Sequence, residues 1–195
     1  MPMPAFFDAA PRIVVHDPLA AFLGAPADGE IEYCYADAVR LAGHSCPTVA
    51  SAWLMTRAAL LTLYPDTLPE RGGIEVAMRG RLQDGVNGVM ANVVSLVTGA
   101  ATQTGFKGIG GRFERRGLFS DDAQIDGDLR FTRAADRKSV TAQARIDRVA
   151  FDPRVPRLMQ RRLAGTATPD EEALFQLLWP GQVEQLLSFM PMIRK

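Results

Sequence analysis

The chain has 195 residues, of which 47% are apolar, and its 22 Lys and Arg balance its 22 Asp and Glu. This balance provides no basic field that would attract nucleic acid or an anionic membrane, so we expect neither as a partner. The length and the apolar fraction together predict one main folded core rather than a disordered chain.

The first residues of the chain lack the basic start and the continuous apolar run of a secretory signal. No later stretch reaches the roughly 18 apolar residues that span a bilayer, because Arg57 interrupts the best candidate. These features predict a cytoplasmic protein. In that compartment Cys34 and Cys46 are expected to be thiols or metal ligands rather than a disulfide.

Two helices and a strand are predicted in the first half of the chain. Residues 31–41 have helical spacing of apolar side chains and stop before Gly43, which is typical of a helix C-terminus. Residues 47–64 are apolar around most of the helical circumference, so we expect this helix to be central. Residues 74–82 follow two glycines and predict a strand.

The second half is predicted to contain more strands and a helical end. Residues 89–97 predict a helix that stops at Gly99, and residues 112–119, 128–134 and 139–149 predict strands. Thr168 and Glu171 form a capping box for a further helix, which Pro180 is expected to kink or break.

These elements predict an α+β fold, in which a mixed or antiparallel sheet packs against a central apolar helix and a C-terminal helical arm follows. We expect residues 1–150 to form the metal- or ligand-binding domain. Residues 151–195 are expected to form a helical extension that packs on this domain or on a partner subunit.

The stretch from Gly43 to Pro47 concentrates one of two histidines and one of two cysteines within three residues. Imidazole and thiolate are both ligands of zinc, and an extended turn could direct His44 and Cys46 at one ion. Pro47 suits the first position of the next helix, which places Cys46 near its N-cap, where the helix dipole favours the thiolate. A purely structural capped turn with a buried thiol is the alternative interpretation.

Three blocks of the chain resemble the formylmethanofuran dehydrogenase FmdE family. They are Ala42-Gly43-His44-Ser45-Cys46-Pro47-Thr48, then Asp84-Gly85-Val86-Asn87, and then Phe106-Lys107-Gly108. The family carries His-Gly-His-x-Cys-Pro-Gly, Cys-Gly-Val-Asp and Gly-Lys-Gly at these places. Among the positions at which the chain differs are Ala42, Thr48, Asp84 and Asn87.

The resemblance implies a metal site made by His44, Cys46 and Asp84, with Cys34 as a less favoured ligand. Asp84 replaces a family cysteine. Its carboxylate is still an anionic metal ligand, but its oxygen is a harder donor than a thiolate sulfur. The implied ion is a divalent transition metal, foremost zinc, with nickel or iron as alternatives. The implied role is an accessory or ligand-sensing module that can take a small-molecule ligand at the metal, and not a complete formylmethanofuran dehydrogenase.

Whether the chain is an enzyme stays open, because no complete catalytic constellation is visible. One alternative is a small metal-dependent enzyme, or one in which Cys46 is a nucleophile beside His44. Another is a haem-binding protein that uses the Cys46-Pro47 pair.

The C-terminal helix carries a long apolar stripe, which predicts a homodimer formed through the C-terminal helices, with packing on the chain's own domain as the alternative. The stripe consists of Leu174, Phe175, Leu178, Trp179, Val183, Leu186 and Leu187.

Overall fold

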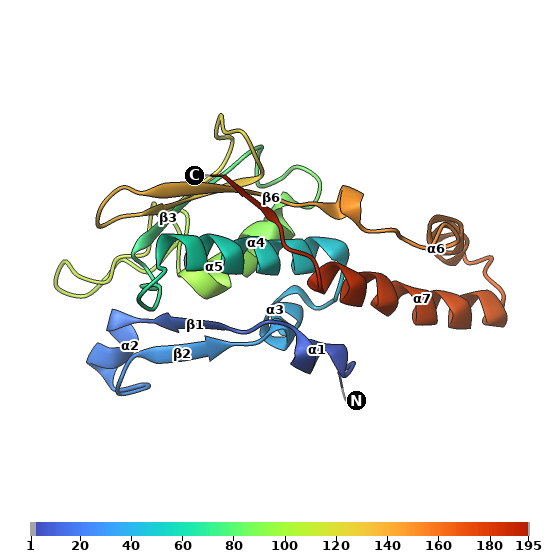
Figure 1. Cartoon of the computed structure of the whole chain (residues 1–195), viewed down its shortest axis with the longest axis horizontal. Helices are drawn as coiled ribbons and strands as arrows, with labels where there is room; N and C mark the ends of the chain where they lie inside the picture. The colour runs from blue at the N-terminus through green and yellow to red at the C-terminus, as the bar shows by residue number, and fades with distance from the viewer. Residues whose placement is uncertain (1–2, 195) are drawn as a thin grey trace.

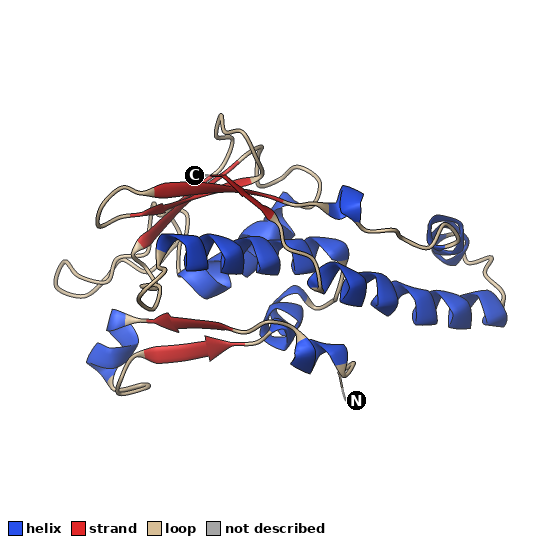
Figure 2. Cartoon of the chain, viewed as in Figure 1, coloured by secondary structure: helices blue, strands red, loops and turns tan. Residues whose placement is uncertain are grey.

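The computed structural model describes residues 3–194 of the chain. A five-stranded sheet, a helical layer and a two-stranded ribbon lie above one another (Figure 1), and the strands lie on both sides of the helices (Figure 2). Helices α4 (Pro47–Leu63) and α5 (Asn87–Thr98) form the middle layer. The predicted α+β class, with a sheet on a central apolar helix and a C-terminal helical arm, is confirmed. No helix in residues 3–194 is long and apolar enough to cross a membrane.

The large sheet has the order β4-β3-β5-β6-β7. Its strands are β3 (Ile74–Met78), β4 (Phe119–Ser120), β5 (Leu129–Arg133), β6 (Ser139–Gln143) and β7 (Met192–Arg194). β3 and β4 run parallel, and the other neighbours are antiparallel. Buried and more exposed residues alternate along β3, as expected when one face of a sheet packs on a helical layer. The sheet is therefore mixed, and its C-terminal strand ties the end of the chain to the main domain.

Helix α4 is the core of the molecule, as its apolar sequence predicts. Trp53, Met55 and Leu60 have at most 1% of their surface exposed. The sheet covers one side of α4, and the ribbon of β1 (Ile13–His16) and β2 (Glu30–Tyr33) lies on the other side (Figure 1). Three short helices complete this outer layer: α1 (Phe6–Ala9), α2 (Pro18–Leu23) and α3 (Tyr35–Ala42).

The helix predicted over residues 31–41 begins later than expected. Residues Glu30–Tyr33 form β2 and pair with β1, and α3 begins only at Tyr35. The local cause is a capping box, because the Asp37 carboxylate accepts from the amide of Cys34 at 2.9 Å. The predicted end is confirmed, since Gly43 adopts the left-handed conformation with φ 75°.

Three predicted strands are wrong in their extent. Residues 112–118 form loop and turn, and only Phe119–Ser120 pairs as β4. The strand expected over residues 139–149 ends at Gln143 and is followed by the short 3-10 helix η1 (Ile146–Arg148). The strand that begins at Ile74 ends at Met78, shortly before Gly80, which has φ 80°. In contrast, α5 ends at Gly99 as predicted.

Of the kink or break predicted at Pro180, the break is wrong, because α7 (Pro169–Leu187) is continuous through this residue. Proline removes one helical hydrogen bond, and burial of the next turn offsets this loss. Val183 and Leu186 have at most 3% of their surface exposed and belong to the main core. The second half of α7 thus packs on its own chain. The first half projects with α6 (Val155–Leu163) away from the layers (Figure 1).

A buried charge cluster joins three loops at the edge of the ribbon. Asp17 caps α2 and accepts from Arg71 at 2.9 Å and from Arg115 at 2.8 Å. Arg115 also donates to the carbonyl oxygen of Arg71. Gly72 is required beside this cluster, because a Cβ there would lie 1.0 Å from Arg115 Nη1. The cluster therefore fixes how the ribbon sits against the rest of the fold.

The Asp17 carboxylate is stabilised in its charged form. Burial alone would raise the pKa of Asp17, but the hydrogen bond from Arg71 and the charge of Arg115 outweigh burial and lower it. A lowered folded-state pKa contributes stability above the unfolded pKa of a carboxyl group. This contribution is lost as the pH falls through the folded-state pKa.

We predict that Asp17→Asn destabilises the fold by about 3–5 kcal/mol at neutral pH, because two arginines lose a buried carboxylate. The difference between wild type and variant should shrink in acid, where Asp17 becomes protonated. Denaturant unfolding at several pH values measures both effects. Asp126→Asn is the control, since its pair with Arg194 leaves the aspartate side chain 89% exposed. A destabilisation that does not change with pH would contradict this account.

Candidate functional site

The turn between α3 and α4 positions the residues singled out in the sequence. Gly43 ends α3, Cys46 is the N-cap of α4 and Pro47 is its first residue. His44 is exposed, whereas Cys46 is half-buried. The predicted placement of Cys46 at the start of a helix is confirmed. Its sulfur therefore lies where the helix dipole favours an anion.

The His44 ring is oriented by the backbone of Ala42, two residues earlier in the chain. Its Nδ1 lies 2.9 Å from the carbonyl oxygen of Ala42, so the neutral ring donates its Nδ1–H to this acceptor. The lone pair of the neutral ring then resides on Nε2. An imidazole that ligates a metal is oriented in the same way, by donating its other N–H to a carbonyl or carboxylate.

Two side chains, one from the adjacent α3 and one from the distant α7, hold the turn at Ser45. The hydroxyl of Tyr35 in α3 lies 3.0 Å from Ser45 Oγ, and Trp179 Nε1 in α7 donates to the Ser45 carbonyl oxygen at 2.9 Å. Burial, foremost, raises the pKa of Tyr35, and the nearby Cys46 raises it further. Tyr35 therefore remains a neutral phenol beside Cys46. The sequence marked Trp179 only as part of an apolar stripe and carried no signal for its contact with Ser45.

Asp84 lies in the turn before α5. Its side chain is exposed, its amide donates to the Arg81 carbonyl oxygen at 3.0 Å, and its own carbonyl oxygen accepts from the Asn87 amide at 3.1 Å. These backbone bonds form a tight turn from which α5 starts. Asp84 and Gly85 thus belong to the connection between β3 and α5.

Both turns lie at the same end of the helical layer. The strand register places Met78, Leu129 and Ala142 together at one end of the sheet. The chain leaves β3 at this end and enters α5. α5 then ends beside the start of β3, where the Gly72 amide donates to the Thr98 carbonyl oxygen at 2.8 Å. α4 ends at the other end of the sheet, where the Leu63 carbonyl oxygen accepts from Arg133. Ser51 and Leu54, which are nearer the start of α4, lie beside Ala144 at the end where α5 begins.

The structure does not assemble the predicted ligands into a closed centre. Within residues 3–194, no three His, Cys, Asp or Glu side chains are grouped so that they could hold a metal ion. His44 and Cys46 share one turn, whereas Asp84 lies on another. Cys34 has a different role, because its thiol donates to Asp37 at 3.2 Å in the capping box of α3.

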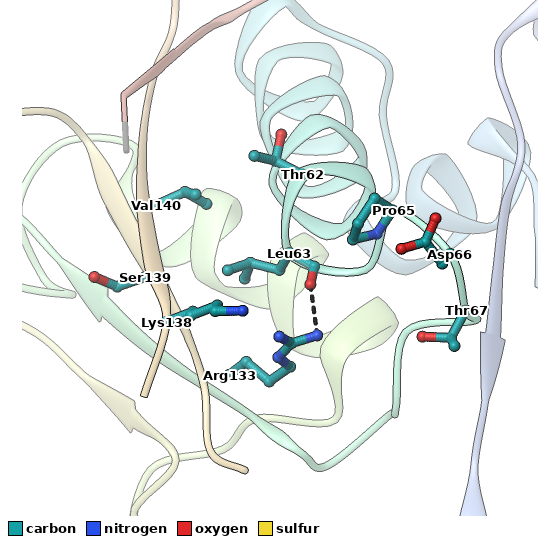
Figure 3. Close-up of a pocket in the computed structure, with 9 residues that line it drawn as sticks. All are labelled: Thr62, Leu63, Pro65, Asp66, Thr67, Arg133, Lys138, Ser139 and Val140. Atoms are coloured by element: carbon teal, nitrogen blue, oxygen red, sulfur yellow. Dashed lines mark hydrogen bonds between the residues drawn. The ribbon is translucent and has the colours of Figure 1, made fainter. Parts of the chain in front are cut away.

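A larger hollow lies at the opposite end of α4, where that helix meets the turn between β5 and β6. It has a volume of about 570 Å³, and Figure 3 shows the side chains that line it. Arg133 donates to the Leu63 carbonyl oxygen at 2.7 Å, which satisfies an unpaired carbonyl at the helix end. The sequence did not single out this hollow, because its walls come from two segments, residues 62–67 and 133–140, that are distant in the chain.

No protein-family model matches the chain, and no curated protein matches it. The resemblance of the three blocks therefore rests on their own residues. A functional proposal for this chain depends on the turn that carries His44 and Cys46 and on its surroundings.

Proposed function

We propose that the chain is a metal-binding accessory or ligand-sensing module of the formylmethanofuran dehydrogenase FmdE type. Its site lies at the end of the helical layer where α4 and α5 begin. The observation that carries this proposal is the contact of His44 Nδ1 with the Ala42 carbonyl oxygen at 2.9 Å. It supports a ligand role because it leaves Nε2 to donate a lone pair to an ion.

The chemistry of the two turn residues suits zinc. Cys46 supplies a soft sulfur at a helix N-terminus, and His44 supplies a borderline nitrogen two residues before it. The Ser45 backbone between them is held by Trp179 at 2.9 Å, which restricts the conformations of this turn. Two donors on a restrained turn lose less conformational entropy on binding than two donors on a mobile loop.

Asp84 is the proposed third ligand. Its turn lies at the same end of the helical layer, and its carboxylate is exposed to solvent. In this proposal the turn moves toward His44 and Cys46 when an ion binds, as loops commonly do on ligand binding. The remaining coordination positions are then available to water or to a small-molecule ligand.

We predict that Cys46→Ser and His44→Ala each abolish most zinc binding while secondary structure is retained. Serine preserves an N-cap and removes the soft ligand, so the Cys46 variant should fold normally. Asp84→Asn should have an intermediate effect, because the amide keeps an oxygen donor and loses the charge. Bound zinc per chain, measured by elemental analysis and by calorimetric titration, tests these variants.

The second histidine and the second cysteine provide matched controls. His16→Ala and Cys34→Ser should bind as much zinc as wild type, because neither side chain lies on the turn. Full zinc occupancy in both the His44 and Cys46 variants would refute the proposal. Equal losses in all four variants would indicate nonspecific binding and would also refute it.

We also propose that the chain forms a homodimer through α6 and the first half of α7. These two helices pack together through Arg161 and Glu171, whose side chains lie 3.0 Å apart. They leave Leu163 83% exposed and Leu177 72% exposed on a projecting element. Exposed apolar side chains on such an element favour association with a second copy.

Sedimentation at micromolar concentration should show a dimer for wild type and a monomer for Leu177→Glu. Because Leu177 is exposed within one chain, its replacement should leave the thermal stability of the folded monomer almost unchanged. Leu61→Glu is the control, since Leu61 is 50% exposed on α4, outside the projecting helices. A monomeric wild type of normal stability would contradict the proposed dimer.

A further inference from the structure

The hollow at the C-terminal end of α4 is separate from the site proposed above. α4 has 17 residues, so its two ends lie about 25 Å apart at 1.5 Å per residue. The volume of about 570 Å³ falls within the usual range for small-molecule sites. Lys138 and Ser139 line it from the β5–β6 turn, and Asp66 lies across from them in the segment that follows α4 (Figure 3).

One wall of the hollow carries a positive charge that is weakly neutralised. Lys138 Nζ lies 3.4 Å from an oxygen of Asp136. That carboxylate is already bound by Arg133, whose Nε donates to it at 2.8 Å and whose Nη2 donates to its other oxygen. The hydrogen bonds from Arg133, foremost, lower the pKa of Asp136. Lys138 therefore retains ammonium N–H groups that can bind an anionic group in the hollow.

The opposite wall is negative. Asp66 makes no hydrogen bond or ion pair with another side chain in residues 3–194. It follows the end of α4, where the carbonyl groups give the helix a partial negative charge. Arg133 satisfies one of these carbonyl groups, that of Leu63. The helix end and Asp66 together favour a cationic group on this side.

Aliphatic side chains lie between the charged walls. Leu63 and Val140 each have 4% of their surface exposed, and Pro65 completes this part of the lining. Figure 3 shows Leu63 and Pro65 between Lys138 and Asp66, and Val140 above Lys138. A ligand that matches the hollow would carry an anion and a cation at opposite ends of an aliphatic portion.

We propose that this hollow binds a linear ω-amino-carboxylate, a zwitterion in which an aliphatic chain separates the ammonium group from the carboxylate. Its carboxylate accepts hydrogen bonds from Lys138 and Ser139, and its ammonium group binds Asp66. Its aliphatic part contacts Leu63, Pro65 and Val140. A ligand with both charges neutralises both walls, whereas a singly charged ligand leaves one of them unpaired.

Calorimetric titration with three molecules of similar size tests the proposal. The probes are 6-aminohexanoate, hexanoate, which lacks the ammonium group, and pentylamine, which lacks the carboxylate. 6-aminohexanoate should bind in the millimolar range or tighter, and each of the other two should bind at least about tenfold more weakly, since losing one charged hydrogen bond costs about 1.5 kcal/mol or more. Absence of 6-aminohexanoate binding at millimolar concentration, or equal affinity for hexanoate, would overturn the proposal.

Variants on the two walls give a second test. Lys138→Met and Asp66→Asn should each weaken 6-aminohexanoate binding at least about tenfold, because each removes one charged partner. Both side chains are exposed, so both variants should fold. Lys107→Met and Asp122→Asn are controls outside the hollow and should bind as wild type does. Unchanged affinity in either wall variant, or equal losses in the controls, would overturn the assignment of the walls.

Discussion

Burial of α4 from both sides is the constraint on which the rest of the structure depends. Trp53, Met55 and Leu60 are almost completely excluded from solvent. Each such side chain contributes about 1.5–3 kcal/mol relative to an exposed one. The sheet alone cannot cover a helix that is apolar around most of its circumference. The ribbon of β1 and β2, α3, α5 and the second half of α7 therefore pack against the remaining faces.

A helix held in this way presents two chemically different ends to solvent. At its start, Cys46 and His44 lie where the dipole favours a thiolate and where Ala42 orients an imidazole. At its finish, Arg133 satisfies the Leu63 carbonyl oxygen, and Asp66 and Lys138 lie on opposite walls of a hollow. The metal proposed at one end and the zwitterion proposed at the other follow from this polarity.

The sequence was most informative where local signals decide the structure. Gly43 and Gly99 end their helices in the left-handed conformation, and the capping box at Thr168 starts α7. The sequence was least informative where contacts between residues far apart in the chain decide the structure. Arg115 was assigned to a strand, yet it pairs with Asp17, which lies 98 positions away. Pro180 remains helical because the following turn is buried in the core.

The same distinction applies to the candidate site. The spacing of His44 and Cys46 before Pro47 predicted a turn at the start of a helix, because capping is a local property. The contact of Trp179 with Ser45 spans 134 positions and depends on how α7 packs against α4. The hollow at the far end of α4 likewise depends on tertiary packing, and no motif in the sequence marks it.

The protonation state of the His44 ring tests the central functional claim most directly. Long-range proton–nitrogen correlation spectra of imidazole-labelled protein distinguish the two tautomers of a neutral imidazole. The account predicts a proton on Nδ1, a free lone pair on Nε2, and a large change in the Nε2 resonance of His44, but not of His16, when one equivalent of zinc is added. A proton on Nε2 together with no response of His44 to zinc would contradict it.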